Sequence, residues 1–66
     1  MDKALKARIA KWVKETGRER AGNLLVKWGV HIDTAVRILN GTYTAQPKDD
    51  LKGRIEGAME EGKDNV

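Results

Sequence analysis

The chain has 66 residues and a formal net charge of +3, and it contains no cysteine. This length supports a single domain with a thin core and leaves little space for a deep enclosed pocket. The absence of thiols excludes disulfide bridges and thiolate metal sites. No apolar run approaches the roughly 20 residues that span a bilayer, and the charged N-terminal residues do not match a signal peptide, so we expect no membrane association.

The charge is divided unevenly along the sequence. Residues 1–30 carry eight Lys and Arg against three Asp and Glu, a net charge of +5, whereas residues 31–66 carry five against seven, a net charge of −2. This division of charge fits a protein whose basic face binds a polyanion and whose acidic face is exposed to solvent. An ordinary lysine-rich surface fits the same charges equally well, so charge alone does not identify a partner.

The first helix is predicted over residues 3–16. Its apolar side chains recur at the spacing of one helix face, and they are Leu5, Ile9, Trp12 and Val13. Asp2 can cap the start of this helix, and Gly17 lies where the end of a helix favours a left-handed residue.

The second helix is predicted over about residues 19–28, and it stops at Gly29. Its apolar face consists of Ala21, Leu24, Leu25 and Trp28. Gly22 lies inside this helix and costs roughly 1 kcal/mol of helix stability relative to alanine. Both tryptophans of the chain fall on apolar helix faces, so we expect them to belong to the core rather than to stack on bases.

The third helix is predicted to begin between residues 32 and 34, with His31 or Asp33 as its cap. It should end before Asn40 and Gly41, because Asn-Gly is a strong stop signal. The same dipeptide can turn a β-hairpin, but the flanking residues lack the alternation of strands.

A polar loop over residues 42–46 leads to the fourth helix, whose first turn we expect to contain Pro47, since the missing N–H of proline is unbonded there anyway. The apolar face of this helix comprises Leu51, Ile55, Ala58 and Met59. Gly53 and Gly57 form a small-residue face against which a second copy could pack closely. Gly62 is expected to end the helix.

Together these elements predict an all-α fold, a compact bundle of four to five short helices in a single domain over residues 1–62, followed by a polar tail over residues 63–66. The sequence has one histidine, no cysteine and no phosphate-binding glycine loop. It therefore lacks a catalytic constellation, and we expect neither enzymatic activity nor a cofactor, metal ion or small-molecule substrate.

The strongest motif lies between residues 29 and 41, where a Gly-Val turn is followed by a short helix and an Asn-Gly stop. It resembles the turn and recognition helix of the Cro and phage-repressor family of helix-turn-helix proteins. The residues that carry the resemblance are Gly29, Val30, Ala35, Ile38, Asn40 and Gly41. Pro47 and the amphipathic helix after it also occupy places usual in that family, so the resemblance spans about residues 20–60.

The chain departs from the family pattern at three positions. The family favours alanine in the middle of the second helix and a branched residue at its partner, whereas this chain has Leu25 and Ala35, an exchange that roughly conserves the packed volume. The glutamine that often opens the second helix and touches phosphate is replaced by Ala21. Arg18 or Arg20 would then supply the phosphate contact.

The resemblance implies that the third helix, about residues 32–40, lies in the major groove of double-stranded DNA. The side chains expected to face outward are His31, Ile32, Asp33, Thr34, Val36 and Arg37. Arg37 is the best candidate for a base contact, since its fork matches O6 and N7 of guanine, although a phosphate contact or an ion pair with Asp33 would also fit. Ile32 and Val36 would meet thymine methyl groups, unless the helix is rotated so that they belong to the core.

Several polar residues have two interpretations. Asp33 either caps the helix, which we favour, or accepts a hydrogen bond from a cytosine amino group, and Thr34 either contacts DNA or supports the first turn. His31 is expected to cap the helix or to neighbour a phosphate rather than to bind a metal. The other expected phosphate contacts are Lys27, Arg20, Asn40, Thr42, Tyr43 and Thr44. Tyr43 fits a core position equally well.

The function expected from the resemblance is that of a Cro-like transcriptional repressor of bacteriophage type, which binds operator DNA as a homodimer at the nucleoid in the cytoplasm of a bacterial host. Two alternatives are a helix-turn-helix scaffold used as a protein-interaction module and an architectural or excisionase-like DNA binder. DNA binding predicts Arg37, Lys27 and residues 42–44 on one positive surface. A protein-interaction module predicts a contiguous apolar patch, formed for example by Ile32, Val36 and Leu39.

Overall fold

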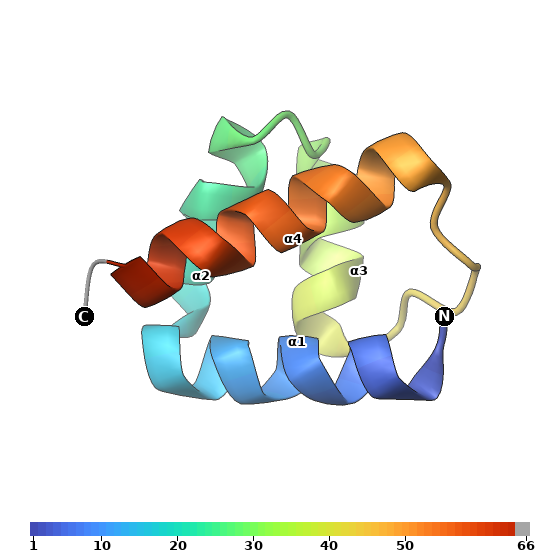
Figure 1. The fold of residues 1–66 in the computed structure, drawn as a ribbon, viewed down its shortest axis with the longest axis horizontal. Coiled ribbons are helices and arrows are strands. Elements are labelled where there is room, and N and C mark those ends of the chain that lie inside the picture. Colours follow the sequence, from blue (N-terminus) through green and yellow to red (C-terminus); the bar gives the residue numbers. More distant parts are fainter. Residues whose placement is uncertain (65–66) are drawn as a thin grey trace.

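The described part of the chain forms four helices: α1 (Lys3–Thr16), α2 (Arg18–Lys27), α3 (Ile32–Asn40) and α4 (Asp49–Asp64) (Figure 1). The structure is a computed structural model that describes residues 1–64. Residues in this range form no strand, so the predicted all-α class is confirmed, with four helices rather than five. The first three helices begin and end within one residue of the predicted positions, because periodicity and caps mark their ends.

The first two helices are joined through a single residue, Gly17. The Asp2 carboxylate accepts a hydrogen bond from the Ala4 N–H at 3.4 Å, which caps α1 as predicted. At the other end of α1 the Gly17 N–H donates to the Val13 carbonyl at 2.9 Å, and the Gly17 carbonyl accepts from the Ala21 N–H at 2.9 Å. One residue therefore ends α1 and begins α2, and no loop separates the two helices.

The turn between α2 and α3 is built on Gly29 and Val30. The Gly29 N–H donates to the Val26 carbonyl at 3.0 Å, and the Val30 N–H donates to the Leu25 carbonyl at 2.9 Å. These two bonds define a Schellman motif, in which an apolar contact usually accompanies the hydrogen bonds. Gly29 has a φ of +92°, which L side chains rarely adopt, and Val30 and Leu25 are both buried in the core. Gly29 is thus required by the path of the backbone, and Val30 suits the core that its side chain enters.

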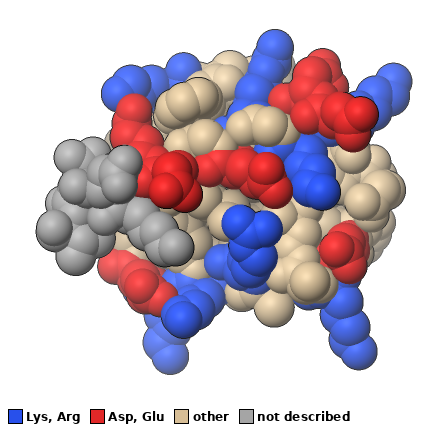
Figure 2. Space-filling view, viewed as in Figure 1, with Lys and Arg blue, Asp and Glu red and all other residues tan. Residues whose placement is uncertain are grey.

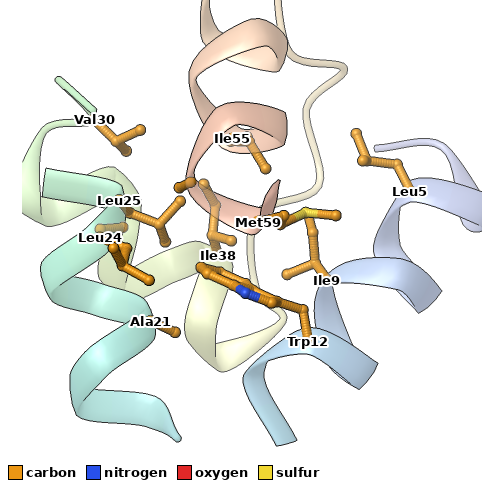
Figure 3. Close-up of a cluster of buried hydrophobic side chains, with 12 residues drawn as sticks. Leu5, Ile9, Trp12, Ala21, Leu24, Leu25, Val30, Ile38, Ile55 and Met59 are labelled. Carbon is orange, nitrogen blue, oxygen red and sulfur yellow. The ribbon is translucent and has the colours of Figure 1, made fainter. Parts of the chain in front are cut away.

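A single hydrophobic core lies where the four helices meet (Figure 3). Helices α3 and α4 each pack against α1 and α2. Leu25 on α2 and Ala35 on α3 are both buried. The buried side chains are Leu5, Ile9, Trp12, Ala21, Leu24, Leu25, Val30, Ala35, Ile38, Ile55, Ala58 and Met59.

The start of α4 differs from the prediction. The helix begins at Asp49, and the first carbonyl to accept a helical bond is that of Lys48, from the Lys52 N–H at 2.8 Å. Pro47 therefore precedes the helix and does not lie in its first turn. Pro47 is buried, so the burial of its apolar ring accounts for its place better than its missing N–H does.

The end of α4 also differs from the prediction. The helix continues through Gly62 to Asp64, so Gly62 does not end it. A Cβ atom on Gly62 would lie 2.5 Å from Nε1 of Trp12, which shows that glycine is needed here for the close approach of α1. Of the predicted polar tail, residues 65–66 lie outside the described residues.

The other tryptophan covers a second glycine of α4. A Cβ atom on Gly57 would lie 2.6 Å from ring atoms of Trp28, whereas a Cβ atom on Gly53 would meet nothing within 4 Å. Trp28 is 41% exposed, so it lies over α4 at the surface and is not the core residue that was predicted. The small-residue face of α4 is therefore occupied in part by a side chain of the same molecule.

Gly53→Ala and Gly57→Ala should change stability in opposite directions. Alanine is favoured over glycine in a helix by about 1 kcal/mol, and Gly53→Ala should raise the free energy of unfolding by that amount. Gly57→Ala should lower it by about 1 kcal/mol, because the methyl group displaces the Trp28 ring and overpacking costs about 1–3 kcal/mol. Urea unfolding followed by circular dichroism measures both. Equal stabilisation by the two variants would show that Trp28 does not pack on Gly57.

Candidate nucleic-acid interface

Helix α3 turns one side to the core and the other to solvent. Ala35 and Ile38 are buried, as predicted. Ile32 and Val36 are 62% and 43% exposed, so a rotated helix with these two residues in the core is excluded. The exposed residues of α3 are Ile32, Asp33, Val36, Arg37 and Asn40, and Thr34 is half-buried.

His31 caps the N-terminus of α3. Its Nδ1 atom accepts a hydrogen bond from the Asp33 N–H at 3.2 Å, which only an unprotonated nitrogen can do. The Asp33 carboxylate lies 3.8 Å from the same nitrogen. The cap predicted for Asp33 is therefore wrong: its side chain is 85% exposed and faces solvent because the imidazole already satisfies the N–H at this end of the helix.

The segment after α3 is only partly available to a ligand. Thr42 donates both its N–H and its hydroxyl to the Arg37 carbonyl, at 3.0 and 3.4 Å, and so completes the end of the helix. Tyr43 is half-buried and packs against the core, as its core interpretation predicts. Thr44 is exposed, and its carbonyl accepts a hydrogen bond from the amino group of Met1.

Two arginines flank the exposed side of α3. The Arg37 guanidinium has no hydrogen-bond or ion-pair partner within the part of the chain that the structure describes, so the ion pair with Asp33 is not formed. Arg18, at the start of α2, donates to the side-chain carbonyl of Asn40 at the end of α3. This contact brings a second cation to the C-terminal end of the outward side.

Lys27 is not assembled with Arg37 on one positive surface. Its Nζ atom donates to both carboxylate oxygens of Glu61, at 3.0 and 3.1 Å, and so faces α4. Arg20 is exposed and lies seven residues before Lys27, which places it on the same side of α2. The predicted basic residues of α2 thus lie to the side of the α3 surface.

An apolar groove of about 440 Å³ runs between α2 and α3. We call it the α2–α3 groove. A Cβ atom on Gly22 would lie 3.2 Å from Leu39, so this glycine lets the two walls approach. Sequence reasoning missed the wall from α2, where Val26 is 46% exposed. The groove is lined by Arg18, Glu19, Gly22, Asn23, Val26, Ile32, Ala35, Val36 and Leu39.

Sequence reasoning also missed Arg54, which holds the turn before α3. Its Nη1 atom donates to the Gly29 carbonyl at 2.9 Å, and its guanidinium carbon lies 3.5 Å from where a Cβ of Gly29 would be. The two residues are 25 positions apart in the chain, so no local pattern predicts the contact. Arg54 ties the turn to α4 and thereby supports the direction of α3.

Comparisons with family models, curated proteins and solved structures gave no significant match. The helix-turn-helix resemblance therefore rests on the residues of this chain. The described residues contain no group of three or more His, Asp or Glu side chains that could bind a metal ion. None of the helices in that range is long and apolar enough to cross a bilayer.

The acidic part of the chain is concentrated on α4. With α4 in front, acidic side chains lie along this helix, and basic side chains lie both among them and around the edges of this face (Figure 2). Helix α4 packs on α1 and α2 and not on α3, so this negative charge is separated from the outward side of α3. The acidic residues of α4 that have described side chains are Asp49, Asp50, Glu56, Glu60 and Glu61.

The cap at His31 can be tested by two substitutions. His31→Ala should lower the free energy of unfolding by about 1 kcal/mol, because the Asp33 N–H loses its acceptor, and His31→Ser should restore most of that loss because serine is a preferred cap. Both variants can be compared with the wild type by urea unfolding. If serine is no better than alanine, the Nδ1 bond does not stabilise the helix.

Proposed function

We propose that this chain is a small DNA-binding protein that inserts α3 into the major groove of double-stranded DNA. The observation that carries the proposal is the outward side of α3, which is exposed and bears Arg37 with no partner for its guanidinium among the described residues. Three features fix the orientation of α3: the His31 cap at its start, the Thr42 hydrogen bond to the Arg37 carbonyl at its end, and the turn at Gly29 before it. A rigid exposed helix with a free arginine is what base recognition needs.

The dimensions of α3 fit this role. An α-helix with its side chains is about 10–12 Å across, and the major groove is about 12 Å wide. The nine residues of α3 make it about 13 Å long, which corresponds to about four base steps of about 3.4 Å each. Entry of the N-terminal part first would bring Ile32, Asp33 and Val36 toward the base edges, with Arg37 beside them.

Two charged residues of α3 can form hydrogen bonds with bases. The Arg37 guanidinium can donate two bonds to O6 and N7 of one guanine. The Asp33 carboxylate does not cap the helix, so it can accept a bond from a cytosine amino group. The remaining exposed side chains of α3 are the apolar Ile32 and Val36 and, at its C-terminal end, Asn40, which accepts a hydrogen bond from Arg18.

Phosphate contacts would come from the flanks of α3. Arg18 and Arg20 lie at the start of α2, and Asn40 and Thr44 lie at and after the end of α3. Lys27 can join them if it leaves Glu61. That ion pair is at the surface, with the Lys27 side chain 65% exposed, and such pairs contribute only about 0–1 kcal/mol, so the exchange for a phosphate costs little.

The more specific role that we propose is that of a Cro-like repressor, which excludes polymerase by occupying an operator and needs neither a catalytic group nor a cofactor. A homodimer would place two α3 helices about 34 Å apart, in successive major grooves of a two-fold operator. Such a protein would act on the nucleoid of a bacterial host. Architectural or excisionase-like binding would use the same contact of α3 with DNA.

Protein docking is a second candidate function, and the α2–α3 groove is the observation that favours it. Ile32, Val36 and Leu39 line this groove together, as the protein-interaction alternative predicts. The two functions differ in their dependence on salt, because counterion release accompanies DNA binding and apolar docking lacks it. Binding to a duplex measured at several salt concentrations separates the two functions.

Fluorescence anisotropy with a labelled random-sequence duplex should show binding at low salt that weakens as salt rises. Three neutralised phosphates correspond to a slope of about −3 in log affinity against log salt. Arg37→Ala should weaken binding to a duplex selected from a random library by about tenfold or more, because a bidentate base contact is lost. Its affinity for random duplex should change little.

Lys52→Ala is the matched control, since it removes the same charge from an exposed position on α4 and should bind both duplexes as the wild type does. An absence of binding to any duplex at low salt would contradict the proposed function. Equal weakening of Arg37→Ala on selected and random duplexes would assign Arg37 to a phosphate.

A further inference from the structure

We infer that α3 selects thymine through the side chains of Ile32 and Val36, which contact thymine methyl groups in the major groove. This inference rests on the proposed DNA binding and specifies which bases the helix prefers. In the described residues, the large apolar side chains left exposed are Val26, Trp28, Ile32 and Val36. Three of these four line the α2–α3 groove, and two belong to the helix that enters DNA.

The α3 wall of this groove is entirely aliphatic, since it consists of Ile32, Ala35, Val36 and Leu39. These side chains have no hydrogen-bond donor or acceptor, so they gain only from covering another apolar group. The apolar group that base edges display in the major groove is the C5-methyl group of thymine. Cytosine lacks this methyl group, so aliphatic contacts at these positions distinguish thymine from cytosine.

The spacing of the two side chains matches the spacing of base pairs. Ile32 and Val36 are four residues apart, which corresponds to about 6 Å along the helix axis. Two base steps cover about 6.8 Å. The helix can therefore contact two thymine methyl groups that are two base steps apart, while Arg37, the next residue, contacts a guanine beside them.

The small area of the aliphatic strip favours DNA over a protein as its occupant. Charges of both signs border the strip, Arg18 and Glu19 on α2 and Asp33 and Arg37 on α3, so its border is close to neutral and the area decides. A standard protein interface buries about 800 Å² of each partner, roughly a sixth of the 4539 Å² surface of this chain. The few aliphatic side chains of this strip supply much less.

The test replaces thymine by deoxyuridine, which forms the same base pair without the methyl group. Duplexes bound by the full chain are first selected from a random-sequence library, and we expect enrichment of two thymines two base steps apart. These thymines are then replaced one at a time and together. Dissociation constants should rise about fourfold for each methyl group removed, the value expected for one buried methyl, and about tenfold or more for both.

The double variant Ile32→Ala/Val36→Ala is the decisive control. Both residues are exposed, so the fold should be retained, as circular dichroism can verify, and the variant should bind thymine and deoxyuridine duplexes with equal affinity. Arg37→Ala should bind more weakly but keep the full difference between the two duplexes, because it removes a different contact.

Three outcomes would overturn the inference while DNA binding stands: selected duplexes without paired thymines, equal affinity of the wild type for thymine and deoxyuridine duplexes, and a deoxyuridine effect that persists in the double variant. A change in sedimentation of the double variant, with its thymine preference intact, would assign the groove to a protein contact and overturn the inference as well. Failure of the wild type to bind any duplex at low salt would instead reject the proposed function itself.

Discussion

The turn at Gly29 and Val30 determines which way every side chain of α3 faces. Two backbone hydrogen bonds close this turn onto α2, and the buried Val30 side chain fixes its depth in the core. Because α3 begins two residues later, the path of this turn sets the rotation of the helix that places Ala35 and Ile38 in the core. The Arg54 bond to the Gly29 carbonyl ties the same turn to α4. The exposure of the outward side of α3 thus depends on one glycine conformation with a φ of +92°.

A chain of 66 residues can build only a thin core, and this one uses glycine to bring large rings onto α4. Trp12 lies against Gly62, and Trp28 lies over Gly57. A ring placed directly on a helix backbone buries apolar area without further side chains. The cost is seen at Trp12, whose Nε1 is buried without a hydrogen-bond partner in the described part of the chain. Such a donor costs about 1–3 kcal/mol, comparable with the gain of about 1.5–3 kcal/mol from burying a large apolar side chain.

Features that depend on neighbouring residues could be predicted from the sequence, and features that join distant segments could not. The apolar spacing of α1 and α3, the Asp2 cap and the Gly-Val turn are local, so their positions follow from the order of residues. Gly62 and Gly57 were assigned to a helix end and an open face, because their tryptophan neighbours belong to other helices. The residues that face outward on α3 could be predicted from the helical spacing of its apolar residues. The α2–α3 groove does not, because its second wall depends on the angle between two helices.

The outward side of α3 is nearly neutral, since Arg37 is balanced by Asp33, so this helix adds little general attraction to DNA. The excess positive charge lies in residues 1–30, which carry +5 and form α1, α2 and the turn. In a complex, long-range attraction would therefore come from α1 and α2, and selectivity from α3. Each neutralised phosphate adds only about 0.9 to the salt slope, and one copy offers few cations beside α3. In the proposed homodimer, two copies on one duplex would double these contacts, so that the proposed complex could bind tightly while the base contacts of α3 remain selective.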